Sequence, residues 1–205
     1  MFVVIEGVEG SGKSTLLSGL AKRLRDEGRE VEVTREPGGT PLGDAAREIF
    51  LNPSVSIAPL TESMLVNAAR AQHVSEVIRP ALAAGRIVLC DRFTDSTLAY
   101  QGYGRGLDLA ALRTVCDIAA GGLSPDLTLL LDLPVAAARE RMSERAAKTD
   151  RIESEGDAFH ERVRQGFLEL ARSPHHCVLD AAQSPEQVLD AALREVRGLL
   201  AARVS

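Results

Sequence analysis

The residues best suited to chemistry form one short stretch near the start of the chain, Gly7-Val8-Glu9-Gly10-Ser11-Gly12-Lys13-Ser14-Thr15. The stretch fits G-x-x-x-x-G-K-[ST], a pattern in which glycines let the backbone curl so that successive N–H groups point at an anion. Lys13 is expected to bring a positive charge to the β- and γ-phosphates, and Ser14 a hydroxyl group to Mg²⁺. The pattern therefore predicts a loop that binds a nucleoside triphosphate.

The segments on either side of this loop are of the kinds that such a loop needs. Phe2–Ile5 is an apolar, β-branched run typical of a buried strand, and leucines recur at helical spacing from Leu16 to Leu24, before Gly28. A strand, a glycine-rich turn and a helix together place the positive end of the helix dipole at the bound phosphate. A chance glycine-rich turn with a surface lysine is the alternative, and these flanks argue against it.

Two carboxylates could hold a metal ion near the phosphates. Asp91 and Asp132 each end an apolar run, and ligands of an open parallel sheet bind beyond the carboxyl ends of its strands. We favour Asp91, because Arg92 follows it and the pair suits a phosphoryl group in transfer. Capping of the next helix is the alternative role for Asp91.

Two arginines, Arg35 and Arg92, follow predicted strands and should face the phosphates. Phosphoryl transfer spreads negative charge over the moving group, so positioned arginines can stabilise its transition state. Ordinary solvated arginines are the alternative.

A second concentration of positive charge comprises Arg139, Arg141, Arg145, Lys148 and Arg151. The segment Ala146–Glu155, in which the last two of these residues lie, is polar and has almost no apolar side chains to bury. We therefore expect a short mobile lid over about residues 141–153 that closes over the triphosphate and excludes water. A solvated charged surface is the alternative.

A few residues could contact a nucleobase. The candidates are Arg70, Ser96, Thr97, Tyr100, Gln101 and Tyr103, which offer stacking surfaces and hydroxyl, amide or guanidinium groups. For Arg70, an exposed position on its helix is an equal alternative. The four histidines show no metal-ligand spacing and are assigned no role.

Length and composition describe an ordinary globular chain. The 205 residues suit a single domain, 1–205, and 45% apolar residues are enough for a full core. A net charge of −5 argues against a nucleic-acid polymer as partner, although it permits a mononucleotide. No apolar run reaches membrane-spanning length. The chain begins directly with a predicted strand, which leaves no room for a signal peptide, and three widely spaced cysteines suggest reduced thiols in the cytoplasm.

Strands and helices alternate along the chain. Five strands are predicted, at Phe2–Ile5, Val31–Thr34, Ile87–Cys90, Leu127–Leu133 and Cys177–Leu179. A long helix should begin at Thr61 and end at Gly85, and Phe93–Gly106 should be a short helix followed by a loop. The alternation predicts an α/β fold in which helices cover both faces of a parallel sheet.

Taken together, these stretches resemble the bacterial thymidylate kinase family, the P-loop kinases that phosphorylate dTMP. The most specific matches are Thr34–Thr40 and Asp91–Gly106, because the phosphate loop alone would indicate only a superfamily. Shorter matches in the same order extend the resemblance over nearly the whole chain: Ile5–Thr15, Ala69–Gln72, Pro125–Thr128 and Asp150–Glu153.

The resemblance implies a three-layer P-loop kinase fold with a five-stranded parallel sheet, a homodimer, and ATP with Mg²⁺ as the donor system. It implies ATP contacts by Gly7–Thr15, metal contacts by Ser14 and Asp91, and catalytic roles for Lys13 and Arg92. Because Glu9 is not followed by an arginine, Arg145 or Lys148 of the lid is the expected source of a further catalytic charge. The implied dTMP-binding residues are Glu9, Arg35, Pro37, Val66, Arg70, Arg92, Ser96, Thr97, Tyr100 and Gln101.

Within that acceptor site, the resemblance places Arg35 and Arg92 at the phosphate and Glu9 near the sugar 3′-hydroxyl. Arg70, Thr97 and Gln101 would contact thymine. The family usually stacks a phenylalanine on the base, at the position that Val66 occupies here. Either this aliphatic side chain packs on the base, or the pocket is wider.

The expected reaction is dTMP + ATP → dTDP + ADP, and three alternatives stay open. A kinase for another nucleoside monophosphate or a nucleoside would share every motif. An ATPase switch would need a water-positioning residue after Asp91 or Asp132, where Arg92 and Leu133 stand. An inactive nucleotide-binding module is disfavoured because Lys13, Ser14 and Asp91 are present.

Overall fold

The computed structural model describes residues 1–143 and 150–203. The five strands are β1 Phe2–Glu6, β2 Val31–Arg35, β3 Ile87–Asp91, β4 Leu127–Asp132 and β5 His176–Asp180. They form one sheet in the order β2-β3-β1-β4-β5, and all neighbouring strands pair in parallel. All five predicted strands, including the alternating one that begins at Val31, are confirmed.

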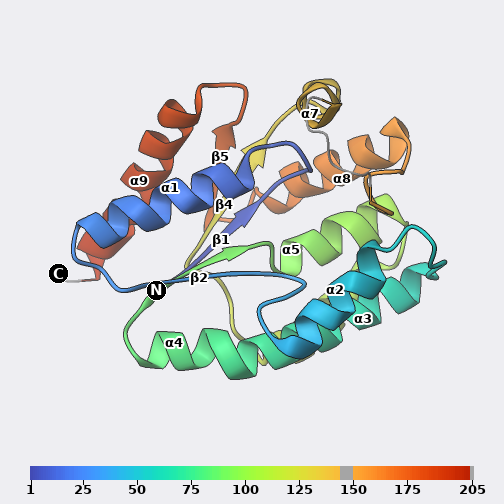
Figure 1. Cartoon of the computed structure of the whole chain (residues 1–205), viewed down its shortest axis with the longest axis horizontal. Helices are drawn as coiled ribbons and strands as arrows, with labels where there is room; N and C mark the ends of the chain where they lie inside the picture. Colours follow the sequence, from blue (N-terminus) through green and yellow to red (C-terminus); the bar gives the residue numbers. More distant parts are fainter. Residues whose placement is uncertain (144–149, 204–205) are drawn as a thin grey trace.

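Helices cover both faces of this sheet. Figure 1 shows α1 (Lys13–Asp26) and α9 (Pro185–Ala202) over one face, with α3 (Pro59–His73) and α4 (Arg79–Ala83) over the other. The remaining α-helices of the described residues are α2 Pro41–Leu51, α5 Thr94–Thr97, α6 Leu109–Ala120, α7 Val135–Ser143 and α8 Asp157–Leu170. The predicted α/β fold of three layers is therefore confirmed. None of the described helices is long and apolar enough to cross a bilayer.

The central strand, β1, shows why its first four residues are all apolar. Val3 and Ile5 pack in the hydrophobic cluster that includes the buried leucines of α1. Phe2 and Val4 pack in a second cluster with Ile78. Successive side chains of a strand point to opposite faces, so a strand covered on both sides needs apolar residues throughout.

The long helix predicted from Thr61 is interrupted. It begins at Pro59 as α3, passes through the π-helix η1 (Val74–Ile78) and ends as α4. Pro59 at the start of α3 suits a first-turn position, where no backbone donor is lost, whereas Pro80 of α4 directly follows the π-helix.

The prediction of a loop before Gly106 is wrong. α5 continues directly into the π-helix η2 (Leu98–Gly104), so the segment is helical to Gly104. The glycines here serve close packing rather than a turn: a Cβ on Gly104 would lie 2.7 Å from the ring of Phe159, and one on Gly102 would lie 2.4 Å from Leu109. Packing against α8 and α6 therefore overrides the local turn propensity.

The strand register brings the chemically interesting segments to one edge of the sheet. Asp91 at the end of β3 lies opposite both Ile5 of β1 and Arg35 of β2. Asp132 at the end of β4 lies opposite Asp180 of β5. The loops after these five strands consequently meet beyond the carboxyl edge, where open parallel sheets bind their ligands.

Candidate active site

The loop between β1 and α1 requires its three glycines for their backbone conformation, and two of them for space as well. Gly7, Gly10 and Gly12 have φ angles of 142°, 79° and 96°, a region that favours glycine. A Cβ on Gly7 would lie 2.6 Å from the carbonyl oxygen of Leu131, and one on Gly10 would lie 2.6 Å from that of Ala138. The backbone therefore adopts the curled form that the sequence pattern predicts.

The start of α1 is prepared for an anion. Gly12 precedes the helix and provides no side-chain cap for the first N–H groups, which carry the positive end of the helix dipole. The hydroxyl group of Ser11 is buried, with no hydrogen-bond partner among the described residues. A phosphate group in the loop would satisfy these donors.

Lys13 lies under the loop. Its Nζ donates to the carbonyl oxygens of Gly7 at 3.0 Å and Val8 at 2.9 Å. Burial, together with the positive charge of Arg92, lowers the pKa of Lys13 to about 8. Negative charge brought into the loop would favour the protonated form again, so Lys13 is poised to respond to a triphosphate.

Arg92 organises the predicted acceptor side. Its φ of 72° is unusual for a residue other than glycine, and such conformations concentrate at functional sites. Its guanidinium donates to Glu9 at 2.6 Å, to Ser96 at 3.0 Å and to the hydroxyl group of Tyr100 at 3.3 Å. Tyr100 in turn donates to Glu9 at 2.5 Å. Four predicted site residues thus form one hydrogen-bonded cluster.

Glu6, which has no predicted role, holds the segment after β3 in place. Only 1% exposed, it accepts hydrogen bonds from the N–H groups of Phe93 at 2.8 Å and Ser96 at 3.2 Å, and from the hydroxyl group of Ser96 at 2.6 Å. Burial raises the pKa of Glu6 to about 7, against the opposing charge of Arg92. At Glu9, by contrast, burial is outweighed by the positive charges around it, which lower the pKa. The sequence offers one sign of this role, because Glu6 is a charged residue that directly follows the apolar run Phe2–Ile5.

Ser14 and Asp91 are suited to hold Mg²⁺. Both line the same cavity beside the loop, and Oδ1 of Asp91 is buried without a hydrogen-bond partner among the described residues. Asp132, the competing candidate, accepts two hydrogen bonds from Arg164 at 2.7 and 2.9 Å. The described residues contain no cluster of three or more His, Cys, Asp or Glu side chains arranged for a metal. One carboxylate and one hydroxyl group nevertheless fit Mg²⁺, which takes its other ligands from water and phosphate.

The cavity in which these groups meet has a volume of 260 Å³. The predicted residues that line it are Glu9, Gly10, Gly12, Lys13, Ser14, Thr15, Pro37, Val66, Arg70, Asp91, Arg92, Ser96, Thr97, Tyr100 and Gln101. Phe50 of α2 lines the same cavity as Val66. An aromatic wall is therefore present, although on a different helix from the one that the family resemblance implies.

Arg70 is not the exposed helix residue of the alternative interpretation. It is 2% exposed, and its guanidinium donates to Glu36 at 2.7 Å and to Phe93 and Thr97 at 3.0 Å each. Glu36 also pairs with the buried His73 at 3.0 Å. His73, which has no predicted role, thus contacts the carboxylate that holds Arg70 in position.

Arg47, rather than the predicted Arg35, lines the described cavity together with Arg92. The Arg35 side chain is 56% exposed, pairs with Asp44 at 3.5 Å and lies outside the described lining of the cavity. Arg47 of α2 lines the cavity and donates to the carbonyl oxygen of Pro37 at 3.2 Å. Burial and the positive charges of Arg35 and Arg92 lower the pKa of Arg47. Arg47 carries no sequence signal, because a single arginine on an amphipathic helix is ordinarily solvated.

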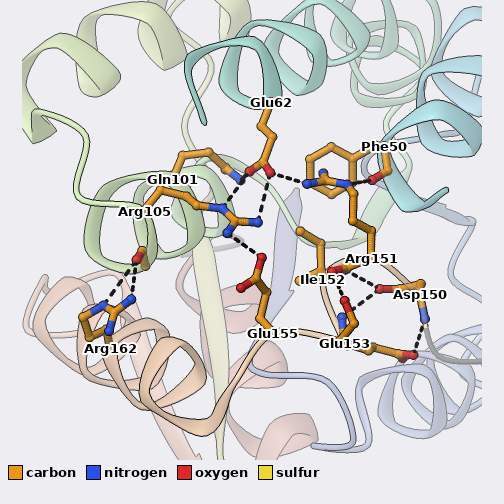
Figure 2. Close-up of polar contacts among 12 residues, drawn as sticks. Phe50, Glu62, Gln101, Arg105, Asp150, Arg151, Ile152, Glu153, Glu155 and Arg162 are labelled. Carbon is orange, nitrogen blue, oxygen red and sulfur yellow. Dashed lines mark hydrogen bonds and ion pairs between the residues drawn. The ribbon is translucent and has the colours of Figure 1, made fainter. Parts of the chain in front are cut away.

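Residues 150–155 form a further wall of the cavity, contributed by Asp150, Ile152 and Glu153. Figure 2 shows how Arg151 attaches this segment to α2 and α3. Its backbone N–H donates to Leu51 at 3.1 Å, its Nε donates to the carbonyl oxygen of Phe50 at 2.9 Å, and its Nη1 donates to the carboxylate of Glu62. The final residues of the predicted lid are therefore held against the rest of the site.

The other residues of the basic concentration that the sequence predicts contact different parts of the molecule. Arg139 pairs with Asp157, and Arg141 donates to the carbonyl oxygen of Ala181 at 3.0 Å. Arg145 and Lys148, the predicted catalytic charges of the lid, lie outside the described residues.

A second cavity, of 350 Å³, adjoins the phosphate loop. It shares Gly10, Gly12 and Thr15 with the first cavity, and Arg141 and the segment after β5 complete it. The residues of that segment and of early α9 are Ala181, Gln183, Pro185 and Val188. The phosphate loop thus stands between two cavities that are each large enough for part of a nucleotide.

Comparisons with known proteins agree on one family. The family model described as thymidylate kinase matches residues 5–192. The chain is 53% identical over 203 residues to a thymidylate kinase of Pseudomonas putida (strain GB-1), covering 98% of this chain and 94% of the relative. It is also 53% identical over 193 residues to a thymidylate kinase of Deinococcus radiodurans, covering 93% of each. The crystal structure of a thymidylate kinase from Ehrlichia chaffeensis is similar, with a TM-score of 0.77, 32% identity and coverage of 96% and 98%.

Proposed function

Since this chain belongs to the thymidylate kinase family, we propose that it transfers the γ-phosphoryl group of ATP to dTMP, producing dTDP and ADP. The observation that carries this proposal is the pair of cavities that share the phosphate loop. ATP would extend from the loop into the cavity beside Arg141, and dTMP would occupy the cavity lined by Arg92 and Gln101. The two phosphates would then meet at Lys13.

The reaction needs no covalent intermediate on the protein. A phosphate oxygen of dTMP attacks the γ-phosphorus, the bond to ADP breaks, and the protein supplies orientation and positive charge. Lys13 would face the triphosphate, while Arg92 and Arg47 would face the phosphate of dTMP. Ser14 and Asp91 would hold Mg²⁺, which supplies further positive charge to the phosphates when it is bound.

On the acceptor side, Glu9 and Tyr100 would hold the sugar and orient Arg92, with which they share hydrogen bonds. Arg70 and Gln101 would face the base, between the Val66 and Phe50 walls of the cavity.

We also propose that the enzyme is a homodimer. A cytoplasmic location stays a prediction from the cysteine pattern.

The test is release of ADP from Mg·ATP in separate reactions with dTMP, dUMP, dCMP, dGMP, AMP and thymidine. We expect strong activity with dTMP and weaker activity with dUMP. Comparable rates with several monophosphates would contradict specificity for dTMP and indicate a nucleoside monophosphate kinase with a broader acceptor range. Release of ADP that is indifferent to every acceptor would instead support an ATPase switch.

A further inference from the structure

One buried carboxylate outside the predicted site receives donors from three side chains. Glu62 of α3 has a side chain 1% exposed. Its Oε2 accepts from Nε2 of Gln101 at 3.2 Å and from Nε of Arg105 at 3.2 Å, and its Oε1 accepts from Nη2 of Arg105 at 3.0 Å and from Arg151. Figure 2 shows these donors converging on Glu62 from Gln101 of η2, from Arg105 just after it and from Arg151.

The surrounding charges hold this carboxylate in one place. Arg105 donates to both oxygens of Glu62, and its Nη1 also donates to Oε1 of Glu155 at 2.5 Å. Arg151 donates to the carbonyl oxygen of Phe50 as well as to Glu62. Two arginines and two glutamates thus balance their charges in a largely buried network. A carboxylate between two guanidinium groups accepts hydrogen bonds and donates none.

This fixed acceptor determines which way the amide of Gln101 can face. Gln101 is 2% exposed and lines the cavity assigned to dTMP. With its NH₂ group against Glu62, its carbonyl oxygen is the atom left to accept a hydrogen bond from a ligand. Rotating the amide by half a turn would set that oxygen against the Glu62 carboxylate, leaving two buried acceptors facing each other, which is costly.

We propose that Glu62 is a positioning residue for base selection, which acts by fixing the orientation of the Gln101 amide. This inference rests on the proposed function and on Gln101 contacting the base. Thymine and uracil present N3–H as a donor, whereas N3 of cytosine is an acceptor. An amide whose oxygen faces the base therefore accepts dTMP and disfavours cytosine nucleotides, because a mismatched acceptor leaves a buried polar group unpaired.

The decisive comparison uses dTMP and 5-methyl-dCMP, which share the methyl group and differ at N3 and the exocyclic group. We expect kcat/KM of the wild-type enzyme to favour dTMP by at least about 10³-fold, as for sites built around a specific hydrogen bond. In Glu62→Gln the new amide can donate as well as accept, so Gln101 can rotate. The discrimination should then fall by at least about tenfold, through a lower KM for 5-methyl-dCMP relative to dTMP.

Glu155→Gln is the matched control. It changes the same charge network on the far side of Arg105 without touching Gln101, so the discrimination should stay at the wild-type value. A Glu62→Gln enzyme that loses rate equally with both nucleotides would overturn the inference, since that outcome shows a structural role only. Wild-type enzyme without activity on dTMP would instead overturn the proposed function, so the two failures are distinguishable.

A measurement on the wild-type protein covers the case in which Glu62→Gln does not fold. The side-chain NH₂ resonances of Gln101, identified by their absence from Gln101→Leu, should exchange with solvent much more slowly than those of surface glutamines. Slow exchange should persist when dTMP is bound, because Glu62 still holds the nitrogen. Exchange as fast as at a surface glutamine would show that Glu62 does not fix the amide, and would overturn the inference.

Discussion

At the scale of single residues, burial shifts the pKa values of two groups in the candidate active site. Lys13 and Glu6 are both buried, and in both cases the charged form is disfavoured by the loss of water. The effect has opposite directions, because the lysine loses its charge on deprotonation and the glutamate gains one. Each shift has its own consequence with pH.

For Lys13, we expect ATP binding to weaken as the pH rises above about 8. Below this value the ligand meets a lysine that is already charged, whereas above it binding must take up a proton. The Kd for ATP should therefore rise by up to about tenfold per pH unit. Calorimetric titrations between pH 7.5 and 9.5, in buffers of different ionisation enthalpy, would measure both Kd and proton uptake. Lys13→Arg should remain charged and lack this dependence, and a pH-independent wild-type Kd would contradict the prediction.

For Glu6, we expect the folded protein to lose stability as the pH rises from about 4.5 to 7. In this window the folded state keeps a proton that the unfolded state releases, so the free energy of unfolding must fall with pH. Relative to Glu6→Gln, the wild type should lose about 3 kcal/mol across the window, since one pKa unit corresponds to about 1.4 kcal/mol. Urea unfolding of both proteins at pH 5 and pH 8 measures the difference. Parallel pH curves for the two proteins would refute the assignment to Glu6.

At the scale of elements, the phosphate loop depends on its contact with α7 as much as on its own sequence. The backbone of Gly10 approaches the carbonyl oxygen of Ala138, a main-chain atom that cannot move without shifting its helix. Gly28, which ends the turn after α1, has nearly the same φ (78° against 79°) but open space around its Cα. Alanine at Gly28 would therefore meet backbone strain alone, whereas alanine at Gly10 would meet the same strain and a steric clash as well.

We expect Gly10→Ala to weaken ATP binding at least about tenfold, because the loop must shift to relieve a 2.6 Å contact. Gly28→Ala should cost only about 1 kcal/mol of stability through its backbone conformation and leave the Kd for ATP unchanged. Calorimetry and chemical denaturation of both variants measure the two effects. Equal ATP affinity in the two variants would mean that packing against α7 is unimportant.

At the scale of the whole molecule, one outer surface is unusually apolar. Leu42 and Ile49 of α2 and Leu60 and Met64 of α3 are each at least 49% exposed. The two helices pack side by side at one side of the molecule (Figure 1). Exposed apolar side chains on two adjacent helices suit a self-complementary interface, as proposed for the homodimer.

Met64→Glu should convert the protein from dimer to monomer, because it buries an unpaired charge in the proposed interface. Size-exclusion chromatography with light scattering gives the mass directly. Val178→Glu, on the edge strand β5 at the far side of the sheet, is a control with similar exposure that should remain dimeric. A wild-type protein of monomeric mass, or a dimer that tolerates Met64→Glu, would exclude this surface as the interface.

What the sequence determines by itself is local in origin. Apolar or alternating runs predict all five strands, glycine spacing with Lys13 defines the phosphate loop, and motif order identifies the thymidylate kinase family. Each of these signals resides within a few neighbouring residues, so no tertiary contact is needed to recognise it. The site roles inferred from the family remain predictions for each residue.

Tertiary structure decided which charged side chains meet. Arg70 pairs with Glu36 across 34 positions of the chain, and Arg151 pairs with Glu62 across 89. Such pairs depend on strand order and helix packing, and no short pattern encodes them. For the same reason only the fold shows that Asp132 is occupied by an ion pair while Asp91 is available. Burial and partner choice distinguish charged residues that look alike in the sequence, and both depend on the folded chain.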